Sequence, residues 1–256
     1  MQADINRRFG GVARLYGEVA LERFRRAHVC VVGIGGVGSW AAESLARSAI
    51  GHITLIDLDH IAESNANRQI HALGDEFGKA KVVAMAERIR AINPSCVVTP
   101  IEEFVELDNL DVLLGAGYDY IVDAIDQTRI KVAIIAWCKA HAVNLVTTGS
   151  AGGQIDPSRI KVADLSRTIQ DPLASRVRAL LRKNYNFPRD LKKKFGVECV
   201  FSDEPLTYPA GDLACGVGES GITGLSCAGF GSSVCVTACF GMVAASRVLN
   251  RLACTA

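Results

Sequence analysis

The chain has 256 residues, a formal net charge of +1, 49% hydrophobic and 21% charged residues. This is an ordinary globular composition with ample length for a sizeable core, and it excludes a partner recognised through overall charge. The N-terminus has no basic segment followed by an apolar one, so a cytoplasmic location is expected. The nine cysteines include no C-x-x-C pair, so we expect reduced thiols and no structural zinc.

A phosphate-binding loop follows the arginine-containing N-terminal arm, residues 1–27. Residues 28–32 form an apolar, β-branched run that predicts a buried parallel strand. The run leads into four glycines and then into a segment with helical periodicity; the glycines are Gly33, Gly35, Gly36 and Gly38. A strand, a G-x-G-x-x-G turn and a helix start place backbone N–H groups around a phosphate. The loop alone fits a dinucleotide-dependent dehydrogenase as well as an ATP enzyme.

The residues after the second strand favour ATP. This strand, residues 53–57, ends in Asp57, where such folds hold a ribose hydroxyl. Polar and cationic residues come next: Asn65, Arg68, Gln69 and Lys81. A helix N-terminus can largely satisfy the diphosphate of NAD, but a triphosphate carries more charge and needs guanidinium and ammonium groups as well. Arg68 and Lys81 are well placed to supply them.

Two carboxylates follow a later strand. A helix over residues 82–92 and a strand over 96–100 are predicted first, and then an apolar strand ends at Asp123, with Asp126 three residues on. Ligands bind at the carboxyl ends of parallel strands, and a carboxylate oxygen beside a triphosphate is a ligand for Mg²⁺. The alternative is a loop carboxylate that caps the helix beginning near Thr128. We favour Mg²⁺ binding by Asp126 and a supporting role for Asp123.

A basic segment occupies residues 172–197, beyond a strand over residues 144–148 and a glycine-rich turn. Its cations are Arg176, Arg178, Arg182, Lys183, Arg189, Lys192, Lys193 and Lys194. Tyr185 and Phe187 are interleaved among them. In a nearly neutral chain this cluster favours contact with phosphates, and aromatic rings there could stack on unpaired bases. The alternative is a solvated helix followed by a loop.

The C-terminal part is uncharged over residues 220–246. The length is compatible with a membrane span, but the many Gly, Ser, Ala and Thr residues favour a buried core or dimer element. Peripheral membrane association is the weaker alternative. Cys235 and Cys239 are four residues apart on a helix-like stretch, and Cys199, Cys215 and Cys227 are either reactive thiols or small packed residues.

Together, the glycine loop, Asp57-x-Asp59, Asn65-x-Asn67-Arg68-Gln69, Gly78-x-x-Lys81 and Asp123-x-x-Asp126 resemble the ThiF/MoeB family, which includes the ubiquitin-activating enzymes. The resemblance implies a doubly wound, mainly parallel α/β sheet, a homodimer, and Mg-ATP used to adenylate a carboxylate. It further implies that Asp57 holds the ribose within a nucleotide site that includes Asp59 and Gln69. Arg68 and Lys81 would hold the phosphates, Asn65 would lie near the reacting groups, and Asp126 would hold Mg²⁺. A monovalent cation is a further candidate.

The N-terminal arm departs from the family pattern. The usual Arg-x-x-Arg-Gln becomes Arg8-Phe-Gly-Gly-Val here, so Arg8 and Arg14 are both candidates for the arginine that crosses the dimer to a partner's ATP. Family members that serve sulfur carriers commonly have two C-x-x-C zinc pairs, and this chain has none.

The amino-acid sequences of residues 8–18, 147–157 and 168–174 resemble those of one branch of the family, whose members cyclise threonylcarbamoyladenosine in tRNA. This resemblance implies ATP-dependent dehydration through a carboxyl-adenylate, with tRNA as a partner and a sulfur-transfer protein as a further candidate partner. The alternative is adenylation of the C-terminal glycine of a ubiquitin-like sulfur carrier. The expected organisation is a single domain, 1–256: an ATP-binding part at 28–153, a crossover with tRNA contacts at 154–225, and a packing or dimer helix at 226–256.

Overall fold

The computed structural model describes residues 4–208 and 230–254. Seven strands form one sheet in the order β3-β2-β1-β4-β5-β7-β6. The strands are β1 (His28–Val32), β2 (His52–Ile56), β3 (Val97–Ile101), β4 (Tyr120–Asp123), β5 (Leu145–Thr148), β6 (Ile160–Asp164) and β7 (Glu198–Ser202). All pairs are parallel except β6 with β7. The predicted doubly wound, mainly parallel α/β fold is confirmed.

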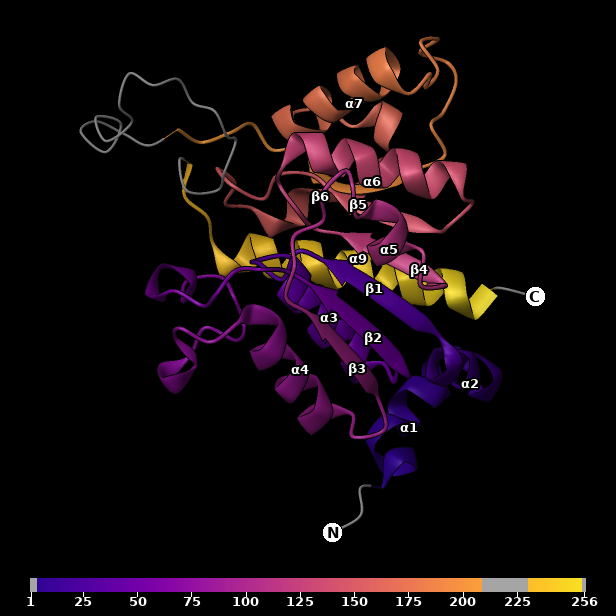
Figure 1. Cartoon of the computed structure of the whole chain (residues 1–256), viewed down its shortest axis with the longest axis vertical. Helices are drawn as coiled ribbons and strands as arrows, with labels where there is room; N and C mark the ends of the chain where they lie inside the picture. Colours follow the sequence, from indigo (N-terminus) through magenta and orange to yellow (C-terminus); the bar gives the residue numbers. More distant parts are fainter. Residues whose placement is uncertain (1–3, 209–229, 255–256) are drawn as a thin grey trace.

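Helices cover both faces of the sheet (Figure 1). They are α1 (Ile5–Tyr16), α2 (Glu18–Arg26), α3 (Gly38–Arg47), α4 (Lys81–Ile92), α5 (Leu110–Leu114), α6 (Thr128–Ala140), α7 (Pro172–Asn184) and α9 (Val234–Cys254). Alternate residues of β1 point to opposite faces: Val29 and Val31 pack with α2, α3, α4 and α9, whereas Cys30 and Val32 pack with α5, α6 and α7. Because both faces are buried, the strand is apolar throughout rather than alternating.

The segment between residues 154 and 225 contains more regular structure than a crossover. β6 pairs antiparallel with β7, and α7 lies between them in the chain. β6 is the edge strand, and two of its five residues, Lys161 and Val162, are exposed. A short, half-exposed edge strand has no apolar run, which is why its sequence gave no strand signal.

The C-terminal helix α9 belongs to the core. Val236, Phe240, Ala244 and Val248 are fully buried on the side of the helix that packs against the sheet and α3. One side of α9 is therefore core, whereas Val234, Cys235 and Met242 are exposed; residues 220–229, like Cys215 and Cys227, lie outside the described residues. Of the helices in the described ranges, none is both long and apolar enough to cross a membrane.

Candidate nucleotide-binding site

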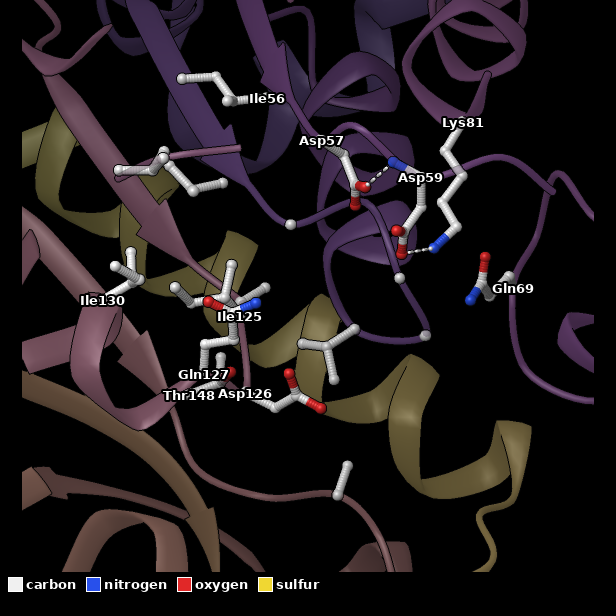
Figure 2. Close-up of a pocket in the computed structure, with 18 of the residues that line it drawn as sticks. Ile56, Asp57, Asp59, Gln69, Lys81, Ile125, Asp126, Gln127, Ile130 and Thr148 are labelled. Carbon is white, nitrogen blue, oxygen red and sulfur yellow. Dashed lines mark hydrogen bonds and ion pairs between the residues drawn. The ribbon is translucent and has the colours of Figure 1, made fainter. Parts of the chain in front are cut away.

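A pocket of about 300 Å³ opens at the carboxyl ends of the parallel strands (Figure 2). It lies where the strand order reverses, between β1 and β4, because β2 follows β1 to one side and β4 lies on the other. This switch point is where open α/β sheets bind ligands. Its lining includes Gly33, Gly35, Gly36, Asp57, Asp59, Arg68, Gln69, Lys81, Asp126, Thr148, Ser150 and Thr237. Most of the predicted nucleotide-site residues are therefore brought together.

The glycine loop connects β1 to α3 in a conformation that only glycine permits at two positions. Gly33 has φ of +87°, in the left-handed region that side chains avoid. A Cβ on Gly38, the first residue of α3, would lie 1.7 Å from the carbonyl oxygen of Gly33. The close approach holds the helix start against the strand end. Gly33, Gly35 and Gly36 line the pocket, whereas Gly38 supports the loop from behind.

Asp57 is fixed by backbone donors directly after β2. Its carboxylate accepts a hydrogen bond from the N–H of Ile34 at 2.6 Å. It also accepts one from the N–H of Asp59 at 2.8 Å (Figure 2). Burial raises the pKa of Asp57, while the nearby Lys81 ammonium and the two backbone donors oppose that rise. The side chain is therefore held in place at the pocket.

Lys81 begins α4, and its ammonium group lies at the pocket. The residue is 5% exposed, and Nζ lies 2.7 Å from Oδ2 of Asp59 (Figure 2). The Asp59 side chain is half exposed, so solvent reaches the pair mainly at the carboxylate and not at the buried lysine. A bound phosphate could compete with Asp59 for this ammonium group, because both are oxygen anions.

Arg68 and Gln69 line the same wall. The Arg68 guanidinium donates to the carbonyl of Ser64 at 2.7 Å and to Oδ1 of Asn67 at 2.8 Å, so it is turned toward its own loop. Its aliphatic stem lies against Gly36. Gln69 is 6% exposed, and its Oε1 has no hydrogen-bond partner among the described residues.

Among the described residues, Asp126 is one of two unpaired carboxylates in the pocket lining, and Glu103 is the other. Asp126 is exposed and has no hydrogen bond or ion pair to any described residue. The alternative role of capping α6 is not observed: Gln127 is the N-cap residue, and the helix start has no side-chain cap bond. The carboxylate is therefore available to a ligand.

Asp123 and Asn65, like Gly38, lie outside the pocket lining. Asp123 is fully buried; its Oδ2 lies 2.8 Å from Nζ of Lys131 and accepts from the Thr147 hydroxyl at 2.6 Å. A direct contact with nucleotide is therefore not supported, and Asp123 acts from behind the pocket wall. Asn65 is buried, and its Oδ1 accepts from the N–H of Ala62, which holds its own turn rather than facing the pocket.

The candidate arginines of the N-terminal arm do not line the pocket of their own chain. Arg8 donates to the carbonyls of Ala91 and Ile92 at 3.0 and 2.6 Å, at the C-terminal end of α4. Arg14 is exposed on α1. The arm precedes β1 and so packs at the opposite edge of the sheet from the carboxyl ends of the strands (Figure 1). Contact with ATP within one subunit is therefore not supported.

The basic segment divides into structural and free cations. Arg178 donates to the Thr168 hydroxyl, and Arg182 donates to the carbonyl of Pro188 and stacks over Phe195 at 5.1 Å. Phe187 is buried and packs against Phe195, so it is a core residue and not available for base stacking. The exposed members are Arg176, Lys183, Arg189, Lys192, Lys193, Lys194 and the half-exposed aromatic Tyr185.

The described cysteines show no built reactive or metal site. Cys199 lies in β7, fully buried, and burial raises the pKa of its thiol well above the ordinary range. Cys235 is exposed and Cys239 half-buried on α9. Within residues 4–208 and 230–254, no three potential metal-ligating side chains gather at one point.

Several lining residues were missed by the sequence reasoning. Phe104 and Val105 follow β3, Ile125 and Ile130 flank the β4–α6 connection, and Thr237 comes from α9, more than a hundred residues away. The apolar residues form the wall that can cover a base. Nothing local in their sequence distinguishes them from core residues, since only the folded arrangement places them together.

The comparisons with known proteins agree with this geometry. The model of the ThiF family matches residues 11–252. The chain belongs to the ThiF family. The dehydrogenase interpretation of the glycine loop is therefore set aside.

Similar members of the ThiF family include proteins named tRNA threonylcarbamoyladenosine dehydratase. The chain is 54% identical to that of Escherichia coli, covering 96% of this chain and 93% of the relative. It is 49% identical to that of Haemophilus influenzae, with the same coverages. The crystal structure of the E. coli dehydratase in complex with ATP matches with a TM-score of 0.88 and 52% identity, covering 98% and 96% of the two chains. A complex of the same protein with AMP also matches, with a TM-score of 0.88.

Proposed function

We propose that this chain catalyses the ATP-dependent dehydration of threonylcarbamoyladenosine in tRNA, through a carboxyl-adenylate. The observation that carries the proposal is the pocket at the switch point, where a phosphate loop, a fixed carboxylate, a buried lysine and a free carboxylate converge. The similarity to dehydratases over nearly the whole chain supports this particular substrate. Adenylation of a sulfur-carrier glycine is the alternative; the relative named molybdopterin-synthase adenylyltransferase is 31% identical over 49% of this chain.

The chain's own residues supply binding and charge neutralisation. N–H groups of the glycine loop and of the start of α3 face the phosphates, and the Asp57 carboxylate accepts a hydrogen bond from a ribose hydroxyl. Lys81 moves from Asp59 to a phosphate oxygen, and Arg68 turns from Ser64 and Asn67 into the pocket. In-line attack on a phosphoryl group depends mostly on positioning and on neutralising phosphate charge, which these groups provide.

Magnesium fits the donor set. Asp126 is exposed and unpaired among the described residues, and Mg²⁺ in phosphoryl-transfer sites is held by one or two carboxylates together with phosphate oxygens and water. When bound, the ion neutralises negative charge on the phosphates. Asp126 would hold it, and Asp123 would hold the connecting loop through the N–H of Ile125 at 3.4 Å.

The chemistry needs no enzyme thiol. A carboxylate oxygen of the threonyl group attacks the α-phosphorus of ATP, and pyrophosphate leaves. A nucleophile of the ureido group then attacks the activated carbonyl carbon, and AMP leaves with the carboxylate oxygen. The substrate therefore loses one water while ATP becomes AMP and pyrophosphate. Because the second attack is intramolecular, the burial of Cys199 is compatible with catalysis.

The partners follow from the same proposal. The exposed cations Lys192, Lys193 and Lys194 beside α7 support a phosphate contact of the tRNA. A homodimer would allow Arg8 or Arg14 to reach the partner's pocket, which neither reaches in its own chain. A sulfur-transfer protein and a monovalent cation are further proposals that the resemblance supports.

The decisive experiment incubates the protein with ATP, Mg²⁺ and threonylcarbamoylated tRNA, and then measures nucleoside masses after digestion. Loss of one water from the modified adenosine, with AMP produced in equal amount, supports the proposal. An unchanged mass, with adenylation of a glycine-ended carrier protein instead, would move the assignment to the alternative.

Asp126 provides the test for magnesium. Asp126→Asn should lower turnover about 100-fold at low Mg²⁺ and regain part of it at high Mg²⁺, because the amide binds the ion more weakly than a carboxylate does. Since Asp126 has no partner among the described residues, the unfolding temperature should stay unchanged. Asp75→Asn, at an exposed carboxylate outside the pocket, is the matched control. Wild-type Mg²⁺ dependence in Asp126→Asn would refute the assignment.

A further inference from the structure

The C-terminal helix α9 contributes one polar side chain to the nucleotide pocket. Thr237 lies in the first turn of α9, is 1% exposed and lines the pocket. Its hydroxyl has no hydrogen-bond partner among the described residues, although its backbone N–H donates to Ser233 at 3.0 Å. A buried hydroxyl without a partner is unfavourable, so its presence calls for an explanation.

The position of Thr237 identifies which part of a ligand it faces. A Cβ built on Gly36 would lie 3.4 Å from Cβ of Thr237 and 3.1 Å from Cγ of Arg68. Thr237 and the stem of Arg68 therefore both lie against Gly36, in the middle of the phosphate loop. The exposed apolar lining residue Phe104 follows β3 and is not among the side-chain atoms nearest to Gly36.

We propose that the Thr237 hydroxyl donates a hydrogen bond to a phosphate oxygen of bound ATP. This inference rests on the proposed function, and it makes α9 part of the binding site in addition to its packing role. The stem of Arg68 covers the same part of the loop while its guanidinium is held by Ser64 and Asn67. When Arg68 turns toward the phosphates, the hydroxyl gains access to them.

The proposal predicts effects of opposite sign on stability and on binding. Thr237→Val keeps the shape and removes a hydroxyl that is unsatisfied in the free protein, so the unfolding temperature should stay equal or rise. The same change should weaken ATP binding about 10-fold, because a hydrogen bond to a charged phosphate is lost. Thr237→Ser retains the hydroxyl and should bind ATP nearly as the wild type does. Adenosine, which has no phosphate, should bind both variants and the wild type equally.

Thr54→Val is the control in which the same substitution removes a hydroxyl that has a hydrogen-bond partner and lies outside the pocket. Thr54 is also buried, but its hydroxyl lies 2.8 Å from Nε2 of His28, on β2 and outside the pocket lining. This variant should lose stability and keep wild-type ATP affinity.

The experiment is calorimetric titration of the full-length variants with ATP and with adenosine, together with thermal unfolding without ligand. The proposal is overturned if Thr237→Val binds ATP like the wild type, if adenosine binding falls equally, or if the variant is destabilised as Thr54→Val is. If the wild type itself binds no ATP, the proposed function fails and the inference with it. Wild-type binding with an unaffected Thr237→Val refutes the inference alone.

Discussion

At the scale of single residues, the pocket side chains are held in a resting arrangement by each other and by the backbone. Lys81 pairs with Asp59, Arg68 is bound to its own loop, and Asp57 is fixed by two N–H donors. A triphosphate brings more negative charge than Asp59 alone, so exchange of partners is favourable on binding. The resting contacts keep buried or half-buried charges paired in the meantime.

Lys81 tests this arrangement. Lys81→Ala should reduce ATP-dependent turnover by about 100-fold or more, because a charge that neutralises phosphate is lost. The fold should persist, since the carboxylate left behind on Asp59 is half exposed and stays solvated. Lys79→Ala is the matched control: Lys79 pairs with Glu76 and Glu87 outside the pocket, so turnover should not change. Steady-state kinetics together with circular dichroism check both variants, and wild-type turnover in Lys81→Ala would contradict the role.

At the scale of elements, the pocket depends on the contact between α3 and α9. Gly241 lies at a close approach of the two helices: a Cβ there would be 2.4 Å from the carbonyl oxygen of Val37 and 2.8 Å from the N of Ala41. Val37 immediately precedes α3 and lines the pocket. The small residue at 241 therefore lets α9 lie against the end of the phosphate loop.

Gly241→Ala should be destabilising, although alanine favours an isolated helix by about 1 kcal/mol over glycine. The added methyl overlaps backbone that cannot move without displacing α3, and overpacking of this kind costs about 1–3 kcal/mol. Urea unfolding should show the loss, and ATP affinity should fall with it because the loop shifts. Asn250→Ala, on the exposed side of α9, should change stability by less than about 0.5 kcal/mol. A Gly241→Ala protein as stable as the wild type would show that the helices can separate freely.

The N-terminal ends of β1 and β2, away from the pocket, begin with two histidines whose rings stack. The rings of His28 and His52 are 3.4 Å apart and nearly parallel, and His28 Nε2 lies 2.8 Å from the Thr54 hydroxyl. Burial, followed by the neighbouring His52, lowers the pKa of His28 from 6.5 to about 4. Partial burial also lowers the pKa of His52. Protonation is therefore disfavoured in the folded state.

The sign of the pH effect follows from that shift. Below pH 6.5 the unfolded chain takes up a proton at His28 before the folded protein does, so stability is lost as the pH falls toward about 4. His28→Phe keeps a stacking ring that cannot titrate. The loss of unfolding free energy between neutral pH and about pH 5 should be smaller in this variant by about 1 kcal/mol, after allowance for solvent screening. Urea unfolding at the two pH values measures the difference, and identical losses in both proteins would contradict it.

At the scale of the whole molecule, the pocket and the exposed cations of the basic segment lie in different parts of the fold. The pocket is built at the carboxyl ends of β1, β2, β4 and β5. The cations follow α7, which packs on α6 at the far side of the sheet from α3 and α4 (Figure 1). The start of α7 is linked to the pocket through Asp171, whose carboxylate accepts hydrogen bonds from the N–H of Ser150 at 3.0 Å and of Ala174 at 2.8 Å.

Charge removal tests the RNA surface. Lys192→Gln/Lys193→Gln should weaken tRNA binding, and the dependence of log affinity on log salt should become shallower by up to about 2, one for each lost phosphate contact. ATP affinity should not change. Arg7→Gln/Arg26→Gln removes the same charge from exposed positions on α1 and α2 and should leave the salt dependence unaltered. Filter binding at several salt concentrations measures both, and equal slopes in all proteins would exclude this surface.

The sequence by itself determined the strand, glycine turn and helix start at the site, because these are local patterns, and their combination with later motifs indicated the family. It also identified Asp57, Lys81 and Asp126, whose side chains follow strands or begin a helix at the sheet's ligand-binding edge. Tertiary structure alone decided that Asp123 faces Lys131, that Phe187 is core, and that Thr237 reaches the phosphate loop. A residue type and its spacing do not determine the direction of a side chain across the fold; that direction is set by packing between elements far apart in the chain.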